Sequence, residues 1–134
     1  MCSPKNHGNY HDNIDFPPLY QAHHADYLED ISLWLDLARI YGSPILELGC
    51  GSGRVLKPLS SAGFPCFGLD NDLNMLIYLK HNLRSVELTR TTLIVADMIF
   101  LPFQRTFPLI ILPCNTYSTL SADHRSLLLN SIFQ

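Results

Sequence analysis

The chain has few charged residues, and basic ones are the scarcer kind. Of its 134 residues only 16% are charged, with 9 Lys and Arg against 12 Asp and Glu, so the formal net charge is -3. Proteins that bind nucleic acids through bulk electrostatics carry a basic patch and a high isoelectric point. The composition therefore argues against a nucleic-acid partner. The lack of a Lys- and Arg-rich run also argues against a cationic helix on a membrane surface.

Closely spaced cysteines and long apolar runs are also missing. Cys2, Cys50, Cys66 and Cys114 are too far apart for a C-x-x-C zinc motif and do not form the pattern of a small disulfide-rich domain. The longest uncharged stretch, residues 106–122, is interrupted by prolines, and no signal-peptide pattern begins the chain. These absences predict a cytoplasmic protein with reduced cysteines, no membrane span and no metal site.

Hydrophobic residues, by contrast, are plentiful enough for one folded domain. They make up 47% of the sequence, and a chain of ~150 residues buries about two-thirds of its unfolded surface. Residues 1–18 are rich in Asn, Pro, His and Gly without an apolar period, so they are predicted to form an N-terminal arm. Residues 19–134 are predicted to form the domain.

Short apolar runs alternate with helical patterns along this domain. Apolar positions at three- and four-residue steps predict a first helix over about 19–41, ended by Gly42 and Pro44. Four strands are predicted at 45–48, 66–69, 92–96 and 109–112, and further helices at 54–62, at 72–83 and after Ser121. Near-continuous Ile, Leu and Val strands separated by helices are typical of a parallel sheet covered on both faces. The predicted fold class is α/β, with a doubly wound parallel sheet.

A glycine-rich turn follows the first predicted strand. Gly49, Gly51 and Gly53 alternate with other residues immediately before the next helix. Glycine allows backbone angles that a side chain forbids, and it lets a ligand approach the main chain closely. The turn is therefore a candidate ligand cradle, although purely structural strand-to-helix turns also use glycine.

Two carboxylates follow the next two strands. Asp70 ends the second strand, which in a doubly wound sheet places it beside the glycine turn, where it can accept hydrogen bonds from both hydroxyls of a ribose. Asp97, within Ala96-Asp97-Met98, follows the third strand and can offer a carboxylate and a neighbouring N–H to an adenine edge. Each also has a plain structural interpretation, as a loop or helix-capping carboxylate.

Four segments together resemble the ordered motifs of class I S-adenosylmethionine-dependent methyltransferases. They are ILELGCGSGR, GLDNDLNML, VADM and LIILPCNTYSTL. The resemblance covers roughly residues 19–134 and implies a Rossmann-like sheet, of which this chain supplies the first four strands in the order 3-2-1-4. It also implies methyl transfer from S-adenosylmethionine, with S-adenosylhomocysteine as the product.

The same resemblance implies where the methionine part of the cofactor lies. Glu47 would be near the amino-acid end of the cofactor. The backbone of Gly49, Gly51 and Gly53 would approach its methionine part, with Cys50 in the same turn.

The resemblance likewise implies the contacts of the nucleoside and of the methyl group. Asp70 would hold the ribose hydroxyls, Asn71 would flank the adenine, and Asp97 with Met98 would meet the amino edge of the base. The remaining residues that it places near the cofactor are Pro113 and Asn115 beside the methyl donor, and Tyr20 and Tyr27 on the first helix.

Neither a catalytic base nor a specific acceptor is assigned. Methyl transfer from a sulfonium mainly requires alignment and exclusion of water, so a general base is optional. Enzymes that methylate the amines of nucleobases or glutamine often carry an Asn/Asp-Pro-Pro-aromatic tetrapeptide where this chain has residues 113–117, PCNTY. A small-molecule acceptor is therefore expected. His23 or His24 could act on an acceptor proton, but surface positions are the more ordinary interpretation.

Two other functions stay open at this point. A nicotinamide-dependent oxidoreductase usually shows G-x-G-x-x-G, whereas here the third glycine comes one residue earlier. An inactive S-adenosylmethionine-binding module is the second alternative. It would fit a chain whose fourth strand, Leu109 to Leu112, is left as an exposed edge. A truncated product, a completing polypeptide or a homodimer paired through that strand would each account for the edge.

Overall fold

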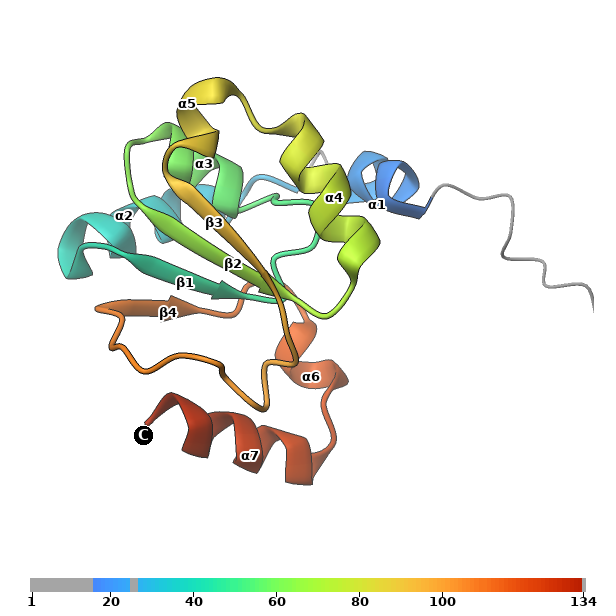
Figure 1. The fold of residues 1–134 in the computed structure, drawn as a ribbon, viewed down its shortest axis with the longest axis vertical. Helices are drawn as coiled ribbons and strands as arrows, with labels where there is room; N and C mark the ends of the chain where they lie inside the picture. The colour runs from blue at the N-terminus through green and yellow to red at the C-terminus, as the bar shows by residue number, and fades with distance from the viewer. Residues whose placement is uncertain (1–15, 25–26, 134) are drawn as a thin grey trace, which may run out of the picture.

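Four parallel strands form the centre of the computed structural model, which describes residues 16–24 and 27–133 (Figure 1). The strands are β1 (Ile45–Leu48), β2 (Cys66–Asp70), β3 (Thr91–Val95) and β4 (Leu109–Ile111). Their order in the sheet is β3-β2-β1-β4. The predicted α/β class, the doubly wound sheet and its strand order are confirmed. The division of the chain at residue 18 stays a prediction.

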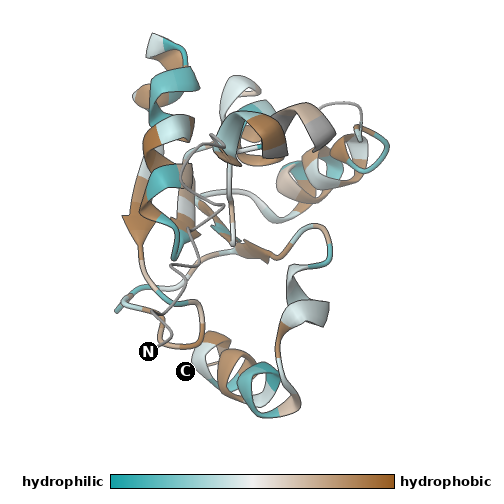
Figure 2. Cartoon of the chain, turned by 90° about the vertical axis from the view of Figure 1, so that its right-hand side faces the viewer, coloured by the Kyte–Doolittle hydropathy of each residue, from teal (hydrophilic) through white to brown (hydrophobic). Residues whose placement is uncertain are grey.

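Strand β1 lies in the interior of the sheet, with β2 on one side and β4 on the other. Ile45 is level with Cys66 of β2 and with Leu109 of β4. All four residues of β1 are buried, which explains why its sequence is apolar without alternation. In Figure 2 the strands are mostly hydrophobic, whereas the surrounding helices carry both kinds of residue.

One face of the sheet is covered by α2 (Ile31–Tyr41), α3 (Leu56–Ser61) and α4 (Leu73–Asn82). Alternate strand residues such as Ile45 and Cys66 join this core, together with the fully buried Leu79 of α4. Asp72 caps α4 as predicted, because its side chain accepts hydrogen bonds from the backbone N–H groups of the first turn. The short helix α5 (Ser85–Leu88), which was not predicted, leads from α4 to β3.

The opposite face is covered by α7 (Ala122–Ile132), which runs below the sheet in Figure 1. Leu128 of α7 is fully buried in a core with Leu46, Leu48 and Leu69. The chain between β3 and β4 adds aromatic residues to this core. A short helix, α6 (Thr116–Thr119), precedes α7 and was also not predicted. Ser121 caps α7 as predicted, since its Oγ accepts from the backbone N–H of His124.

The single helix predicted over 19–41 is wrong. Two helices occupy this region, α1 (Phe16–His24) and α2, and residues 27–30 between them are not helical. The Asp30 carboxylate accepts hydrogen bonds from Trp34 Nε1 at 2.8 Å and from Arg54 at 2.6 and 2.9 Å. The two hydrogen bonds from Arg54, 24 residues after Asp30, are long-range contacts just before α2 that the apolar period of the sequence does not encode.

Strand β4 pairs with β1 and, within the described residues, with no other strand. Among those residues, no helix is both long enough and apolar enough to span a membrane.

Candidate active site

A cleft of about 460 Å³ lies at the carboxyl ends of the strands. Gly49 follows β1, Asp70 ends β2, and Asp97 and Met98 follow β3, so residues at the carboxyl end of each of these three strands line the cleft. The remaining lining residues are Phe16, Gly51, Asn71, Asp72, Met75, Ala96, Ile99, Thr116, Thr119, Leu120 and His124. In open α/β sheets, ligands bind in this position.

The glycine turn forms one wall of the cleft with its backbone. Gly49, Gly51 and Gly53 all have positive φ angles, of 67°, 52° and 86°. A Cβ atom on Gly49 would lie only 3.0 Å from Cγ2 of Thr116 and 3.4 Å from Cε of Met98. The positive φ angles favour glycine at all three positions. At Gly49 the close contacts also leave little space for a side chain.

Asp70 connects this turn to the start of α4. Its Oδ2 accepts a hydrogen bond from the backbone N–H of Gly51 at 2.8 Å, and its Oδ1 accepts one from the N–H of Asp72 at 2.9 Å. Each carboxylate oxygen can accept a second hydrogen bond. The carboxylate is therefore held in a fixed orientation and retains capacity for a ligand.

The cleft is acidic. Asp70, Asp72 and Asp97 line it, and none of the described residues that line it is Lys or Arg. The Asp97 carboxylate accepts a hydrogen bond from the N–H of Ile99 at 3.1 Å, which does not neutralise its charge. The wall charges thus favour a cationic ligand.

A smaller cavity of about 20 Å³ adjoins the cleft and shares Gly49 and Thr116 with it. Glu47 lines it and is only 4% exposed. Neither Oε2 of Glu47 nor Nε of Arg54, which also lines the cavity, has a hydrogen-bond partner among the described residues. Burial raises the pKa of Glu47 to about 8, although the nearby Arg54 charge opposes this shift.

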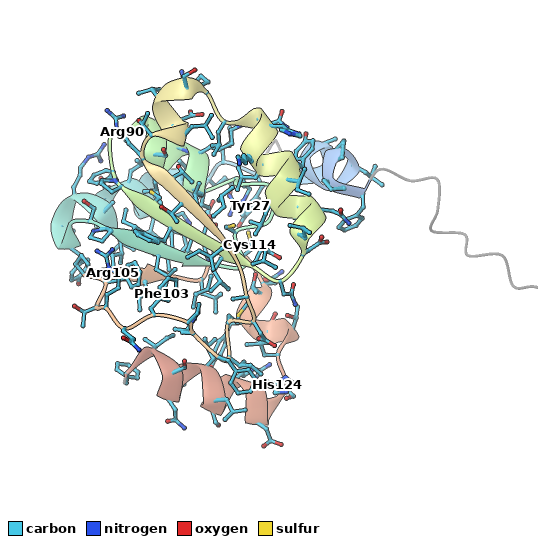
Figure 3. All side chains as sticks on the ribbon, viewed as in Figure 1. Tyr27, Arg90, Phe103, Arg105, Cys114 and His124 are labelled. Carbon is cyan, nitrogen blue, oxygen red and sulfur yellow. The ribbon has the colours of Figure 1, made fainter. Side chains whose placement is uncertain are left out.

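Arg54 connects three separate parts of the chain around this cavity. Its guanidinium forms two hydrogen bonds to Asp30, one to the backbone oxygen of Tyr27 at 2.7 Å and one to Sγ of Cys114 at 3.0 Å. It also lies 5.2 Å from the centre of the Tyr27 ring. The hydrogen bonds from Arg54 lower the pKa of Asp30 to about 2. Figure 3 shows Tyr27 and Cys114 near the carboxyl ends of the central strands.

Comparison with known families identifies the chain. Residues 45–134, from the start of β1 onward, match the family model described as a methyltransferase domain. The chain belongs to this methyltransferase family. No curated protein matches it. The nicotinamide-dependent alternative receives no support from this match.

Solved structures share the fold of this methyltransferase domain. The glycopeptide N-methyltransferase MtfA in complex with S-adenosyl-L-methionine has a TM-score of 0.70 at 22% identity, over 81% of this chain and 50% of MtfA. CcbJ from Streptomyces caelestis gives 0.69 at 20% identity, covering 77% and 43% of the two chains, and DesVI from Streptomyces venezuelae gives 0.70 at 20%, covering 89% and 52%. The chain thus spans about half the length of these proteins. S-adenosylmethionine is the cofactor indicated by the family and by the MtfA complexes, one of which contains S-adenosyl-L-homocysteine.

Most predicted site residues of the methyltransferase domain lie at these two cavities. The cleft is lined by Gly49, Gly51, Asp70, Asn71, Asp97 and Met98, and the smaller cavity by Glu47, Gly49, Cys50 and Pro113. Gly53 instead lies at a shallow hollow beside Leu28 and Lys57. Asn115 precedes α6 and lines neither cavity.

The tyrosine predictions have different outcomes. Tyr27 stacks on Arg54, is 53% exposed and is not among the residues that line the cleft. Tyr20 lies in α1, but its side chain is outside the described part of the structure, as are those of His23 and His24.

Several lining residues were not predicted. Arg54 is the last residue of the glycine motif, but its partners are distant in sequence. Thr116, Thr119, Leu120 and His124 reach the cleft from the chain that follows β4, and His124 lies at the start of α7 (Figure 3). Thr116, Thr119 and Leu120 belong to LIILPCNTYSTL, one of the four segments that carry the family resemblance, so that motif was the available signal for them, whereas His124 lies beyond it.

Proposed function

We propose that this chain binds S-adenosylmethionine and transfers its methyl group to a small-molecule acceptor. The observation that carries the proposal is the hydrogen bond between the glycine turn and Asp70. Gly51 donates its backbone N–H to this carboxylate, and both residues line the acidic cleft of about 460 Å³. Ligand pockets of about 300–1,000 Å³ are typical for molecules of this size.

The described residues fit the chemistry of this cofactor. Asp70 has lone pairs left for ribose hydroxyls after its two backbone hydrogen bonds. Asp97 and Met98 lie in the same cleft and supply a carboxylate and an apolar surface for the adenine. Glu47 has a buried oxygen that lacks a hydrogen-bond partner among the described residues, which suits the ammonium group at the other end of the molecule. These roles are assignments that support the proposal and await binding experiments.

The cofactor would supply a methyl group already activated by a positively charged sulfur. The residues of this chain then need to bind it, orient it and keep water away. The acidic cleft stabilises a cationic sulfonium more than the neutral sulfur of the product, so its charge favours methyl donor over product. No catalytic base is assigned.

Titration calorimetry with S-adenosylhomocysteine tests the site directly. We expect binding by the wild-type chain and a loss of about 1–3 kcal/mol in Asp70→Ala, because a charged acceptor for the ribose is removed. Asp36→Ala is the matched control, since Asp36 is an exposed carboxylate on α2 paired with Arg39. Equal affinities in Asp70→Ala and Asp36→Ala would contradict this placement of the site. A folded chain that does not bind the ligand at all would contradict the proposed cofactor.

Activity is a separate question from binding. We propose an active enzyme, with an inactive cofactor-binding module as the alternative. Incubation with a labelled methyl donor and a mixed metabolite pool distinguishes them, because only an enzyme passes the label to an acceptor. Label that stays on the cofactor, despite demonstrated binding, would favour the inactive module.

Two further expectations belong with this proposal. A homodimer paired through Leu109 to Leu112 would cover the edge of β4, which has no strand partner on its outer side among the described residues. Sedimentation that shows a stable monomer at micromolar concentration would contradict it.

The expected cytoplasmic location rests on the spacing of the cysteines and can be checked by microscopy of a tagged chain.

A further inference from the structure

The small cavity beside the cleft is lined by Glu47, a buried residue whose carboxyl group has a hydrogen bond from the backbone of Leu56 but whose Oε2 has no partner among the described residues. Glu47 is almost fully buried, its Oε2 accepts no hydrogen bond from any described residue, and it lines the cavity shared with the glycine turn. A buried and unpaired carboxylate is costly, and proteins avoid the cost by pairing the group or by keeping it protonated. How Glu47 is neutralised therefore depends on the charges around it.

The terminal nitrogens of Arg54, the one cation near Glu47 among the described residues, donate to other groups, while its Nε has no partner among those residues. Arg54 donates two hydrogen bonds to Asp30, at 2.6 and 2.9 Å, and further ones to Tyr27 and Cys114. Asp30 thus offsets part of the stabilisation that the Arg54 charge gives to the ionised form of Glu47. The Arg54 charge still favours the ionised form of Glu47, but its effect is smaller than the effect of burial.

The other titratable groups around Glu47 do not stabilise its negative charge. Asp70 at the end of β2 and Asp30 before α2 both disfavour it. The thiols of Cys50 and Cys66 are themselves affected by Glu47, and burial raises the pKa of each. Cys114 lines the same cavity from the β4 side and is bound by Arg54.

These contacts keep Glu47 protonated near neutral pH while no ligand is bound. Burial raises its pKa to about 8, above neutral pH, so the protonated form predominates in the free site. An ammonium group placed against Oε2 would make the ionised form of Glu47 the more stable one, because an adjacent cation stabilises a carboxylate.

We propose that binding of the cofactor at this cavity expels the proton of Glu47, so the ligand's ammonium group takes the place of that proton. This inference rests on the proposed function, because it uses the amino-acid end of S-adenosylmethionine or its product as the source of the ammonium. The site therefore distinguishes ligands that carry the amino-acid group from nucleosides that lack it, and binding becomes weaker as the pH falls.

The sign of the pH effect follows from proton linkage. Below about pH 8 the free site holds a proton that the complex lacks, so affinity falls as the pH is lowered. The decrease approaches tenfold per pH unit while the complex stays ionised. Above about pH 8 the free site is already ionised, and the affinity becomes independent of pH.

Calorimetry in two buffers measures the released proton. Titrations with S-adenosylhomocysteine at pH 7, in phosphate and in Tris, differ in heat by the number of protons released times the difference between the buffer ionisation enthalpies. We expect nearly one proton released. 5′-Methylthioadenosine, a nucleoside without the amino-acid group, should bind without proton release.

Two variants test whether Glu47 is the source of the released proton and whether Arg54 influences its release. Glu47→Gln should release no proton and bind S-adenosylhomocysteine with an affinity that is unchanged between pH 6 and 8. Asp30→Asn frees the Arg54 charge and should move the pH dependence to lower pH, with fewer protons released at pH 7. This second variant supplies a test if Glu47→Gln does not fold.

The outcomes separate this inference from the proposed function. Binding of S-adenosylhomocysteine without proton release at pH 7 would overturn the inference and leave the proposed function intact. Equal proton release with 5′-methylthioadenosine would also overturn it, because the ammonium group would not be responsible. Absence of any binding would refute both.

Discussion

Replacement of Gly53 by alanine should destabilise the domain by two separable effects. Gly53 has a φ angle of 86°, which L-residues rarely adopt. A Cβ atom there would lie 2.3 Å from Cδ1 of Leu79, which is fully buried in α4. The surrounding core cannot absorb a contact this short without moving.

The two effects can be given magnitudes. Backbone strain of this kind costs about 1–3 kcal/mol, and an added methyl group in a filled core costs about another 1–3 kcal/mol. We expect Gly53→Ala to lower the free energy of unfolding by about 2–6 kcal/mol in total. Gly63→Ala is the matched control: its φ is 103° but nothing lies within 4 Å of the added atom, so only the strain remains.

A double-mutant cycle isolates the packing effect. Leu79→Ala alone should cost about 2–5 kcal/mol through the cavity that it leaves. In that background the methyl group of Gly53→Ala has space, so the double variant should be about 1–3 kcal/mol more stable than the sum of the single changes predicts. Urea unfolding, followed by Trp34 fluorescence and far-UV circular dichroism, measures all four proteins. Equal costs for Gly53→Ala and Gly63→Ala, or strict additivity with Leu79→Ala, would refute the reasoning.

Two further predictions concern stability. Burial opposes ionisation of Glu87, but hydrogen bonds from Ser61 and Arg84 outweigh it and lower its pKa to about 2. Its stabilising effect is therefore present above the unfolded value of 4.5 and is lost as the pH falls toward about 2. In urea unfolding, the free energy of unfolding of Glu87→Gln should fall less than that of the wild type as the pH is lowered over this range. An equal fall in both proteins would contradict the assigned role of Glu87. Leu128→Ala should cost about 2–5 kcal/mol. Leu129→Ala, at an exposed position of α7, should change stability by less than about 0.5 kcal/mol, and similar costs in both would show that α7 is not docked through Leu128.

Local patterns were sufficient to predict most of the fold. The four strands, the glycine turn and the capping residues Asp72 and Ser121 all depend on neighbouring residues and on strand or helix periodicity. The place of Asp70 beside the turn followed from topology alone, because parallel strands end at the same edge of the sheet. The break between α1 and α2 could not be predicted, since it depends on Arg54, 24 residues after Asp30.

The sequence by itself therefore determined the α/β class through local periodicity, and it indicated the methyltransferase strand order and the position of the cleft through the resemblance of its four ordered motifs to that family. Only the tertiary structure decided the state of Glu47. The residue is one of four in a buried strand, and nothing in its neighbours along the chain shows that Oε2 has no partner among the described residues or that Asp30 forms an ion pair with Arg54. Those facts depend on α2, the glycine turn and the end of β4 meeting in space. Burial and charge pairing are properties of that assembly, and they set the protonation of the carboxyl group.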